Sequence, residues 1–293
     1  MPKEFVHRAA VAEVMLTNWE RKDDTRFRVA AQWPRSHSFF TPIDGHYDPL
    51  MAAETIRQVG YLLAHAEFGV PFGHQFLLWD IELAVHPEHL EVRQTPASLD
   101  MEVTCTRIKR RGSGDLVGLR YEVAVLRDGH LAATGGVSFT CTNSAAYQRV
   151  RGEHALNGDQ QPLPLTAPAA PQSVGRTSPV DVVLSPVAEP NRWRLRVDTR
   201  HPVLFDHPVD HVPGMLLIEA ARQAAAGALG ATSLLPLAIT SDFKRYVELG
   251  VPCVIDAALV PVRQPDGRRT VLVTGHQEGV LCYSASVTAS PQG

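Results

Sequence analysis

The chain has 293 residues, of which 44% are hydrophobic and 20% charged. This composition is typical of a protein with an apolar core, and the length fits one large domain or two of ordinary size. The net charge of −3 gives no reason to expect a nucleic acid or an anionic membrane as a partner. The N-terminal sequence has no apolar signal core, and no apolar run is long enough to span a bilayer, so we expect a cytoplasmic protein.

A long helix is predicted in the first half of the chain. Asp48 is a good N-cap, and Pro49 suits the first helical position. Apolar residues continue to about Phe68, where Gly69 can end the helix. Because apolar residues dominate its sequence, this helix should be mostly enclosed by the rest of the protein.

Strands are predicted on both sides of this helix. Before it, residues 27–33 have the composition of a strand. After it, apolar and polar residues alternate with a period of two, and Asp128-Gly129 fits a hairpin turn. The alternating segments cover residues 101–108, 119–125 and 133–140.

Residues 151–175 form the obvious break in the chain. The prolines between residues 160 and 171 exclude a helix or a central strand there. We therefore predict a surface linker over 151–175 that joins two domains, residues 1–150 and residues 176–293.

The second half repeats the order of elements in the first. A strand is predicted at 193–197, a helix from Pro213 to Gly230, and strands at 270–274 and 282–288. Glu278-Gly279 fits a second hairpin turn. The four cysteines are scattered along both halves without metal-ligand or redox spacing, so we interpret them as buried thiols in a reducing compartment.

One sequence pattern occurs in both predicted helices. Glu-x-x-Arg-Gln, after an apolar run that a proline opens, stands at residues 54–58 and again at 219–223. The repeat predicts two copies of one domain. One long buried helix with four or five antiparallel strands is the set of elements that makes up the hot-dog fold. The predicted class is therefore α+β: a tandem hot-dog, in which each of two long central helices is wrapped by a curved antiparallel sheet. Such domains pair, so we expect a monomer that is an intramolecular pseudo-dimer, or a homodimer of it.

The paired acid and base on each helix have two interpretations. Glu54 and Arg57, like Glu219 and Arg222, are three residues apart and share a helix face. They could be plain ion pairs, or a structural bridge across the pseudo-dimer interface. Their apolar neighbours place these charges on or beside a buried face. Because buried charges are costly and are usually retained for a reason, we favour a functional role over a structural one. An arginine could then bind a phosphate, and a desolvated glutamate with a raised pKa could act as a general base.

Histidines gather before both helices. His46 and His211 hold the same place before the two glutamates, His207 precedes His211, and His37 matches His201 as another repeated pair. A metal site at His207 and His211 is disfavoured, because Pro208 excludes a continuous helix there. Proton transfer and loop hydrogen bonding remain the two roles expected for these side chains.

The longest motifs resemble the A-factor biosynthesis family, AfsA. They cover residues 35–42, 47–50 with 52–58, 73–76 and 201–215. The resemblance implies a tandem hot-dog enzyme that transfers a β-ketoacyl group from acyl carrier protein, or CoA, to a hydroxyl of dihydroxyacetone phosphate. This reaction is the first step toward a γ-butyrolactone-type bacterial signal. It also implies that both glutamates and both arginines are functional.

The site predicted on this basis has catalytic and substrate-binding members. The expected catalytic residues are Glu54, Glu219, His207 and His211. The expected substrate-binding residues are Arg57, Arg222, Gly214, Met215, His37 and His46, with backbone N–H groups near Gly214 holding the oxyanion. Glu54 is expected to face the carbonyl as the base. No cofactor and no metal are expected. A hot-dog dehydratase or thioesterase, and a non-enzymatic regulator that binds a lipid signal, are the alternatives.

Overall fold

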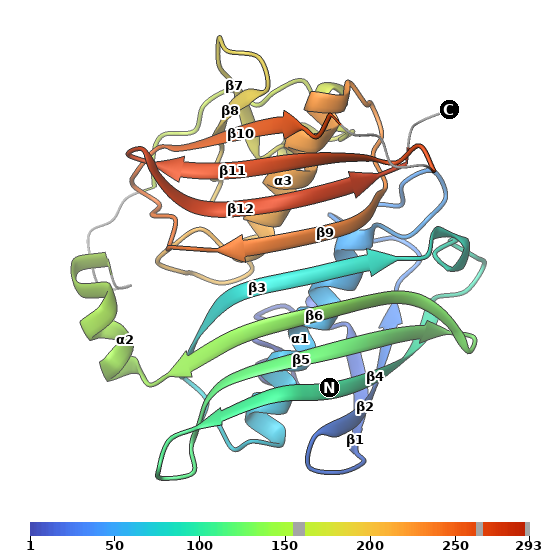
Figure 1. Ribbon diagram of the computed structural model, residues 1–293, viewed down its shortest axis with the longest axis vertical. Coiled ribbons are helices and arrows are strands. Elements are labelled where there is room, and N and C mark those ends of the chain that lie inside the picture. Colours follow the sequence, from blue (N-terminus) through green and yellow to red (C-terminus); the bar gives the residue numbers. More distant parts are fainter. Residues whose placement is uncertain (155–161, 262–265, 291–293) are drawn as a thin grey trace. The chain divides into compact units, whose positions relative to one another are not determined.

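The computed structural model describes residues 1–154, 162–261 and 266–290. The chain divides into two compact units, Met1–Gly152 and Glu153–Gly293 (Figure 1). Within these described residues, each unit contains one long helix and six antiparallel strands. No helix in the described ranges is long and apolar enough to cross a membrane.

The first unit is built from strands around helix α1, Pro49–Ala66, which lies against one face of the sheet (Figure 1). The strand order is β1-β2-β4-β5-β6-β3. The strands are β1 (Leu16–Arg21), β2 (Arg26–Trp33), β3 (Gln75–Val85), β4 (Ala97–Arg110), β5 (Leu116–Arg127) and β6 (His130–Thr142). A short helix, α2 (Ser144–Arg151), ends the unit.

Helix α1 forms where the sequence predicts it. The Asp48 side chain accepts a hydrogen bond from the N–H of Leu50, and Pro49 occupies the first turn. Two glycines let the helix approach the sheet closely. A Cβ on Gly60 would lie 2.7 Å from the Tyr121 hydroxyl, and one on Gly135, in β6, would lie 2.7 Å from the Ile56 side chain of the helix. The helix is mostly buried, as predicted.

The second unit repeats this plan around helix α3, Gly214–Leu229, which ends at Gly230 in the left-handed conformation. The strand order is β9-β12-β11-β10-β8-β7. The strands are β7 (Leu184–Pro186), β8 (Arg192–Leu195), β9 (Pro236–Phe243), β10 (Cys253–Leu259), β11 (Arg269–Gln277) and β12 (Val280–Ala289).

The predicted linker differs from the structure over its later residues. Part of the segment 162–175 belongs to the second unit and packs against the rest of it, instead of running free over the surface. The N–H of Ala169 donates to the Leu184 carbonyl, and the side chain of Val174, in a short 3-10 helix at Pro171–Val174, is buried. The prolines do exclude regular strands and α-helix, but apolar side chains between them still bury surface. The earlier part of the predicted linker, residues 155–161, lies outside the described residues.

Candidate functional site

A buried cluster of charged groups joins helix α1 to the segment before β1. Glu54 has no exposed surface, and its carboxylate accepts two hydrogen bonds from Arg57, at 2.8 and 2.9 Å. Arg8, from the N-terminal segment, binds the same carboxylate with its Nη2 at 2.6 Å from Oε1. Gln58 also donates to Glu54, at 2.8 Å. Glu54 is therefore a carboxylate held by two arginines and an amide.

These partners determine the ionisation of Glu54. Burial alone would raise the pKa of this carboxyl group, but the charges of Arg57 and Arg8, with hydrogen bonds from Arg57 and Gln58, outweigh it. The pKa falls from 4.5 to about 2. The prediction that burial would give this glutamate a raised pKa is therefore wrong, because two cations face it.

The second unit contains the same cluster. Glu219 is fully buried, and Arg222 binds it with two hydrogen bonds, at 2.6 and 3.0 Å. Arg176 takes the place of Arg8, with its Nε 2.8 Å from Oε1 of Glu219. Gln223 donates to the same carboxylate. Burial raises the pKa of Glu219, but Arg176 and Arg222 together lower it to about 2.

The glutamine of each motif ties the helix to the chain segment that precedes the first strand. Gln58 donates to the Glu13 carbonyl and accepts from the N–H of Met15. Gln223 does the same with the Asp181 carbonyl and the N–H of Val183. The two segments share the pattern Arg-x-x-x-x-acid-Val, at residues 8–14 and 176–182. This repeat was the sequence signal that could have identified Arg8 and Arg176, which the sequence analysis missed.

The paired histidines His37 and His201 anchor loops beside these clusters. Nδ1 of His37 accepts the N–H groups of Phe39 and Phe40, both at 3.2 Å, and its Nε2 lies 3.4 Å from a Glu13 carboxylate oxygen. His201 makes the matching contacts with the N–H groups of Val203 and Leu204 and with Asp181. Loop anchoring, one of the two expected roles, accounts for these contacts. The substrate-binding role predicted for His37 remains a prediction.

The clusters also bear on the roles predicted for the charged side chains. The Arg222 side chain is 1% exposed and that of Arg57 is 13% exposed, and each directs two donors at its own glutamate. A guanidinium bound in this way has fewer donors left for a phosphate. The catalytic roles of Glu54 and Glu219, and the phosphate-binding roles of Arg57 and Arg222, remain predictions. The geometry supports a structural role for all four.

The N-termini of the two long helices differ. At α1, the Asp48 side chain takes the N–H of Leu50, and Pro49 has no N–H. At α3, the N-cap is Pro213, whose side chain cannot accept a hydrogen bond. In the part of the chain that the structure describes, no acceptor is found for the N–H groups of Gly214 and Met215. Helix α3 therefore presents two open N–H groups at the positive end of its dipole.

A histidine and an aspartate lie just before these open N–H groups. Nδ1 of His211 is 2.6 Å from Oδ1 of Asp210, whose side chain is 5% exposed, and the His211 side chain is 29% exposed. The ring of Tyr246 packs edge-on against His211, with 4.8 Å between ring centroids. An Nδ1–H that donates to the carboxylate leaves Nε2 as a proton acceptor. His211 therefore has the arrangement of a general base.

The other two predicted histidines are placed differently. Nδ1 of His46 donates to the backbone carbonyl of Asp44 at 2.9 Å. The partner of this nitrogen is therefore a carbonyl, whereas Nδ1 of His211 has a carboxylate partner. His207 is 44% exposed and lies 3.3 Å from Asp206. Across the described ranges, no three His, Cys, Asp or Glu side chains lie together in a way that could hold a metal ion.

Comparison with known proteins places this chain in a family. Residues 1–143 and 158–292 match the A-factor biosynthesis hotdog domain. Two curated relatives carry the name 2-oxo-3-(phosphooxy)propyl 3-oxoalkanoate synthase. The one from Streptomyces virginiae is 53% identical over 287 residues, 98% of this chain and 96% of the relative. The one from Streptomyces coelicolor is 42% identical over 289 residues, 98% of this chain and 91% of the relative.

A solved structure shows the same fold. It is an acyl-ACP thioesterase from Bacteroides thetaiotaomicron, with a TM-score of 0.53 and 13% sequence identity over 90% of this chain and 98% of that one. At this identity the likeness shows only the fold. The predicted α+β tandem hot-dog is confirmed by the family match and by this structure. The chain belongs to the A-factor biosynthesis hotdog family.

Proposed function

We propose that this protein transfers a 3-oxoacyl group from a thioester to a hydroxyl of dihydroxyacetone phosphate. The product would be a 2-oxo-3-(phosphooxy)propyl 3-oxoalkanoate, the precursor of a γ-butyrolactone-type signal. The observation that carries the proposal is the 53% identity, over nearly the full length of both chains, to a relative named for making this product. Acyl carrier protein is the proposed donor, with CoA as the other possible carrier, and the cytoplasm is the proposed location.

The reaction requires a group that stabilises negative charge on the thioester oxygen. In this proposal, the open N–H groups of Gly214 and Met215 donate to the carbonyl oxygen. They hold it as it becomes an oxyanion, and the helix dipole of α3 adds to the stabilisation. Because the N-terminus of α1 is closed by Asp48 and Pro49, we assign the thioester to the second unit.

A base must remove the proton of the attacking hydroxyl, and we propose His211 for this role. The acceptor oxygen attacks the carbonyl carbon while its proton passes to Nε2 of His211, and Asp210 stabilises the resulting imidazolium. The tetrahedral intermediate then collapses, the C–S bond breaks, and the thiolate recovers the proton. One ester and one thiol result, so the reaction needs no oxidant, no reductant and no cofactor.

The buried glutamate clusters have a positioning role in this proposal. A carboxylate with a pKa of about 2 is a weak base near neutral pH. Glu219 and its arginines instead hold helix α3 against the segment that carries Arg176. This contact fixes the position of the N-terminus of α3 within the second unit. None of the four cysteines is proposed as a nucleophile, because all are buried and burial raises the pKa of each thiol.

Mass spectrometry of the products tests this function. The purified protein is incubated with a 3-oxoacyl carrier protein, with and without dihydroxyacetone phosphate. We expect the phosphorylated 3-oxo ester, and thiol release that depends on the acceptor. A thioesterase would release the thiol equally well without acceptor. A dehydratase would act on a 3-hydroxyacyl thioester with loss of water, and a non-enzymatic regulator would bind the lipid unchanged. Any of these three outcomes would overturn the proposal.

A further inference from the structure

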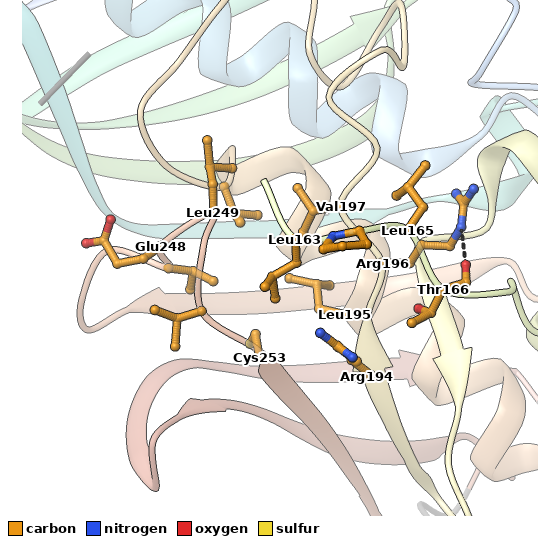
Figure 2. Close-up of a pocket in the computed structure, with 14 residues that line it drawn as sticks. Leu163, Leu165, Thr166, Arg194, Leu195, Arg196, Val197, Glu248, Leu249 and Cys253 are labelled. Carbon is orange, nitrogen blue, oxygen red and sulfur yellow. Dashed lines mark hydrogen bonds between the residues drawn. The ribbon is translucent and has the colours of Figure 1, made fainter. Parts of the chain in front are cut away.

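Figure 2 shows the side chains around the space beside strand β8 in the second unit. That space has a volume of about 20 Å³, which is room for about one water molecule. A larger cavity, of about 260 Å³, lies in the first unit. The segment that follows α1, the turn between β4 and β5, and the end of β6 line it. The β4–β5 hairpin and helix α2, which begins after Asn143, therefore meet at this cavity.

The β4–β5 hairpin is strongly basic. Residues 107–115 carry four basic side chains and one acidic one, a net charge of +3, whereas the whole chain carries −3. The basic residues are Arg107, Lys109, Arg110 and Arg111, and all four are exposed. The acid, Asp115, accepts a hydrogen bond from the Ser113 hydroxyl at 2.6 Å. Positive charge is therefore concentrated on one exposed hairpin of a chain that is acidic overall.

The charges of this hairpin differ from those on the rest of the sheet. There, Arg28 binds Asp100 at 3.0 Å and Arg120 binds Asp80 at 2.9 Å. In the hairpin, Arg110 donates to a backbone carbonyl of its own turn at 2.7 Å. Over the described residues, the remaining three basic side chains of the hairpin form no ion pair; they are Arg107, Lys109 and Arg111. Three exposed cations are therefore available to a partner from outside the chain.

A β-bulge places two of these cations on the solvent face of the sheet. The pairing of β4 with β5 shifts between Cys105 and Arg107, so that Arg107 stands opposite Arg120 and Lys109 opposite Gly118. Side chains two residues apart lie on the same face of a strand. Arg107 and Lys109 therefore share the outer face with the partly exposed Arg120. Because like charges directly opposite each other lower the stability of a sheet, this arrangement is unfavourable for folding.

The fold does not require this basic hairpin. By their places in the two strand orders, β10 in the second unit corresponds to β4. Strand β4 has 14 residues and β10 has 7. Residues 260–268, between β10 and β11, carry a net charge of +1, and Arg268 there binds Asp266 at 2.8 Å. The same sheet therefore forms with much less positive charge on this turn, which favours a binding role for the hairpin of the first unit.

Helix α2 adds a further cation at this end of the first unit. Asn143, which lines the cavity, accepts the N–H of Ala146 and caps the helix. Residues 144–151 contain no acid. Arg149 is exposed and, among the described residues, pairs with no acidic side chain, and Val150 beside it is 69% exposed. The hairpin and α2 lie at the same end of the sheet of this unit, on the left in Figure 1.

We propose that the basic surface formed by Arg107, Lys109, Arg111 and Arg149 binds acyl carrier protein through an acidic face of that protein. The inference rests on the proposed function for the identity of the partner. Exposed cations that lack partners in their own chain complement an acidic surface, speed its approach and fix its orientation. Val150 supplies an apolar contact at the edge of the same surface. This surface makes acyl carrier protein, rather than CoA, the preferred donor.

The kinetic test offers one acyl group with and without the carrier protein. The double variant Arg107→Glu, Lys109→Glu is compared with wild type on a 3-oxoacyl carrier protein and on the S-acyl pantetheine with the same acyl group. The KM for the carrier protein should rise about tenfold or more, while kcat/KM for the pantetheine thioester should stay within about twofold. Added salt should raise the carrier-protein KM of wild type and change that of the variant much less, because it screens the same charges.

Binding provides a readout that does not depend on turnover. Fluorescein-labelled holo-acyl carrier protein is titrated with each variant, and its anisotropy is followed. The double variant should bind about tenfold more weakly than wild type, and Arg149→Glu about threefold. Because Arg149 lies on a different element, its variant keeps the test decisive if the hairpin variant does not fold. The matched control is Arg268→Glu, which makes the same change in charge in the corresponding hairpin of the second unit and should leave the Kd unchanged.

Several results would overturn the proposal. One is an unchanged Kd for the carrier protein in both first-unit variants. Another is an equal loss of activity with the carrier protein and with the pantetheine thioester. A third is tighter binding of wild type to a short DNA duplex, or to vesicles of an anionic phospholipid, than to the carrier protein. If the carrier protein binds as expected but no ester of dihydroxyacetone phosphate forms, the proposed function fails while the docking surface stands.

Discussion

Arg176 repeats in the second unit the contact that Arg8 makes in the first. Each arginine comes from the segment before the first strand of its unit, and each reaches the fully buried glutamate of the long helix. A buried carboxylate with two cations is costly to desolvate, and its partners offset that cost only while all are present. The motif Glu-x-x-Arg-Gln is therefore half of a cluster whose other half lies far away in the sequence.

Removal of either glutamate charge should destabilise the protein more than it impairs the chemical step. Glu219→Gln leaves Arg176 and Arg222 buried without their counter-ion, and we expect a loss of about 3–5 kcal/mol in the free energy of unfolding. Denaturant titration measures the loss. Single-turnover acyl transfer by the folded fraction should stay within about tenfold of wild type. Loss of more than a hundredfold in a variant of unchanged stability would restore the glutamate as the catalytic base.

Acid should lower the stability that the same clusters provide, because protonation of the two glutamates removes the charge that their arginines bind. Glu54 and Glu219 have folded-state pKa values of about 2, below the ordinary 4.5. Their contribution to stability is therefore complete above pH 4.5 and is lost as the pH falls from 4.5 toward 2. We expect a fall on the order of a few kcal/mol in unfolding free energy over that window. The Glu54→Gln variant should show a shallower dependence, and an equal dependence in variant and wild type would contradict this account.

Arg57→Lys distinguishes a structural arginine from one that binds the acceptor. Lysine keeps the charge but loses the two-donor fork that Arg57 directs at Glu54. We expect a drop in thermal midpoint, with the KM for dihydroxyacetone phosphate changed by less than about threefold. Steady-state kinetics at a temperature well below the midpoint measure this. A large rise in acceptor KM at unchanged stability would support the phosphate contact predicted from sequence.

Local signals in the sequence predicted much of this fold. Asp48, Pro49 and Gly230 marked the helix ends, and the alternating segments became β4, β5, β6, β11 and β12. Strands β1, β3, β7, β9 and β10 were not predicted. In β3 the signal was present, because buried Ile81, Leu83 and Val85 alternate with exposed residues. Arg8 lies far from its partner Glu54 in the chain, so the only sequence signal for it was the Arg-x-x-x-x-acid-Val pattern that occurs at residues 8–14 and again at 176–182.

His211 should be required for turnover and not for folding. Its side chain is 29% exposed, and the amide N–H of His211→Asn can still donate to Asp210, so the fold should be kept. Loss of the general base should lower kcat by about a hundredfold to ten-thousandfold. His207→Asn is the matched control, because that side chain is more exposed and lies on its own aspartate. Comparable losses in both variants, or none in either, would contradict the assignment of His211 as the base.

Substitution of Gly214 by proline tests the open helix end directly. Proline is well tolerated at the first helical position, and Pro49 already occupies the equivalent position in α1. Gly214→Pro removes one of the two open N–H groups, and loss of one such donor typically lowers kcat by about a hundredfold to a thousandfold. The matched control, Pro49→Gly, adds an N–H at the closed end of α1 and should leave kcat within about twofold of wild type. Single-turnover transfer and circular dichroism are measured on both variants. A well-folded Gly214→Pro protein with wild-type kcat would show that the thioester oxygen is not held at the start of α3.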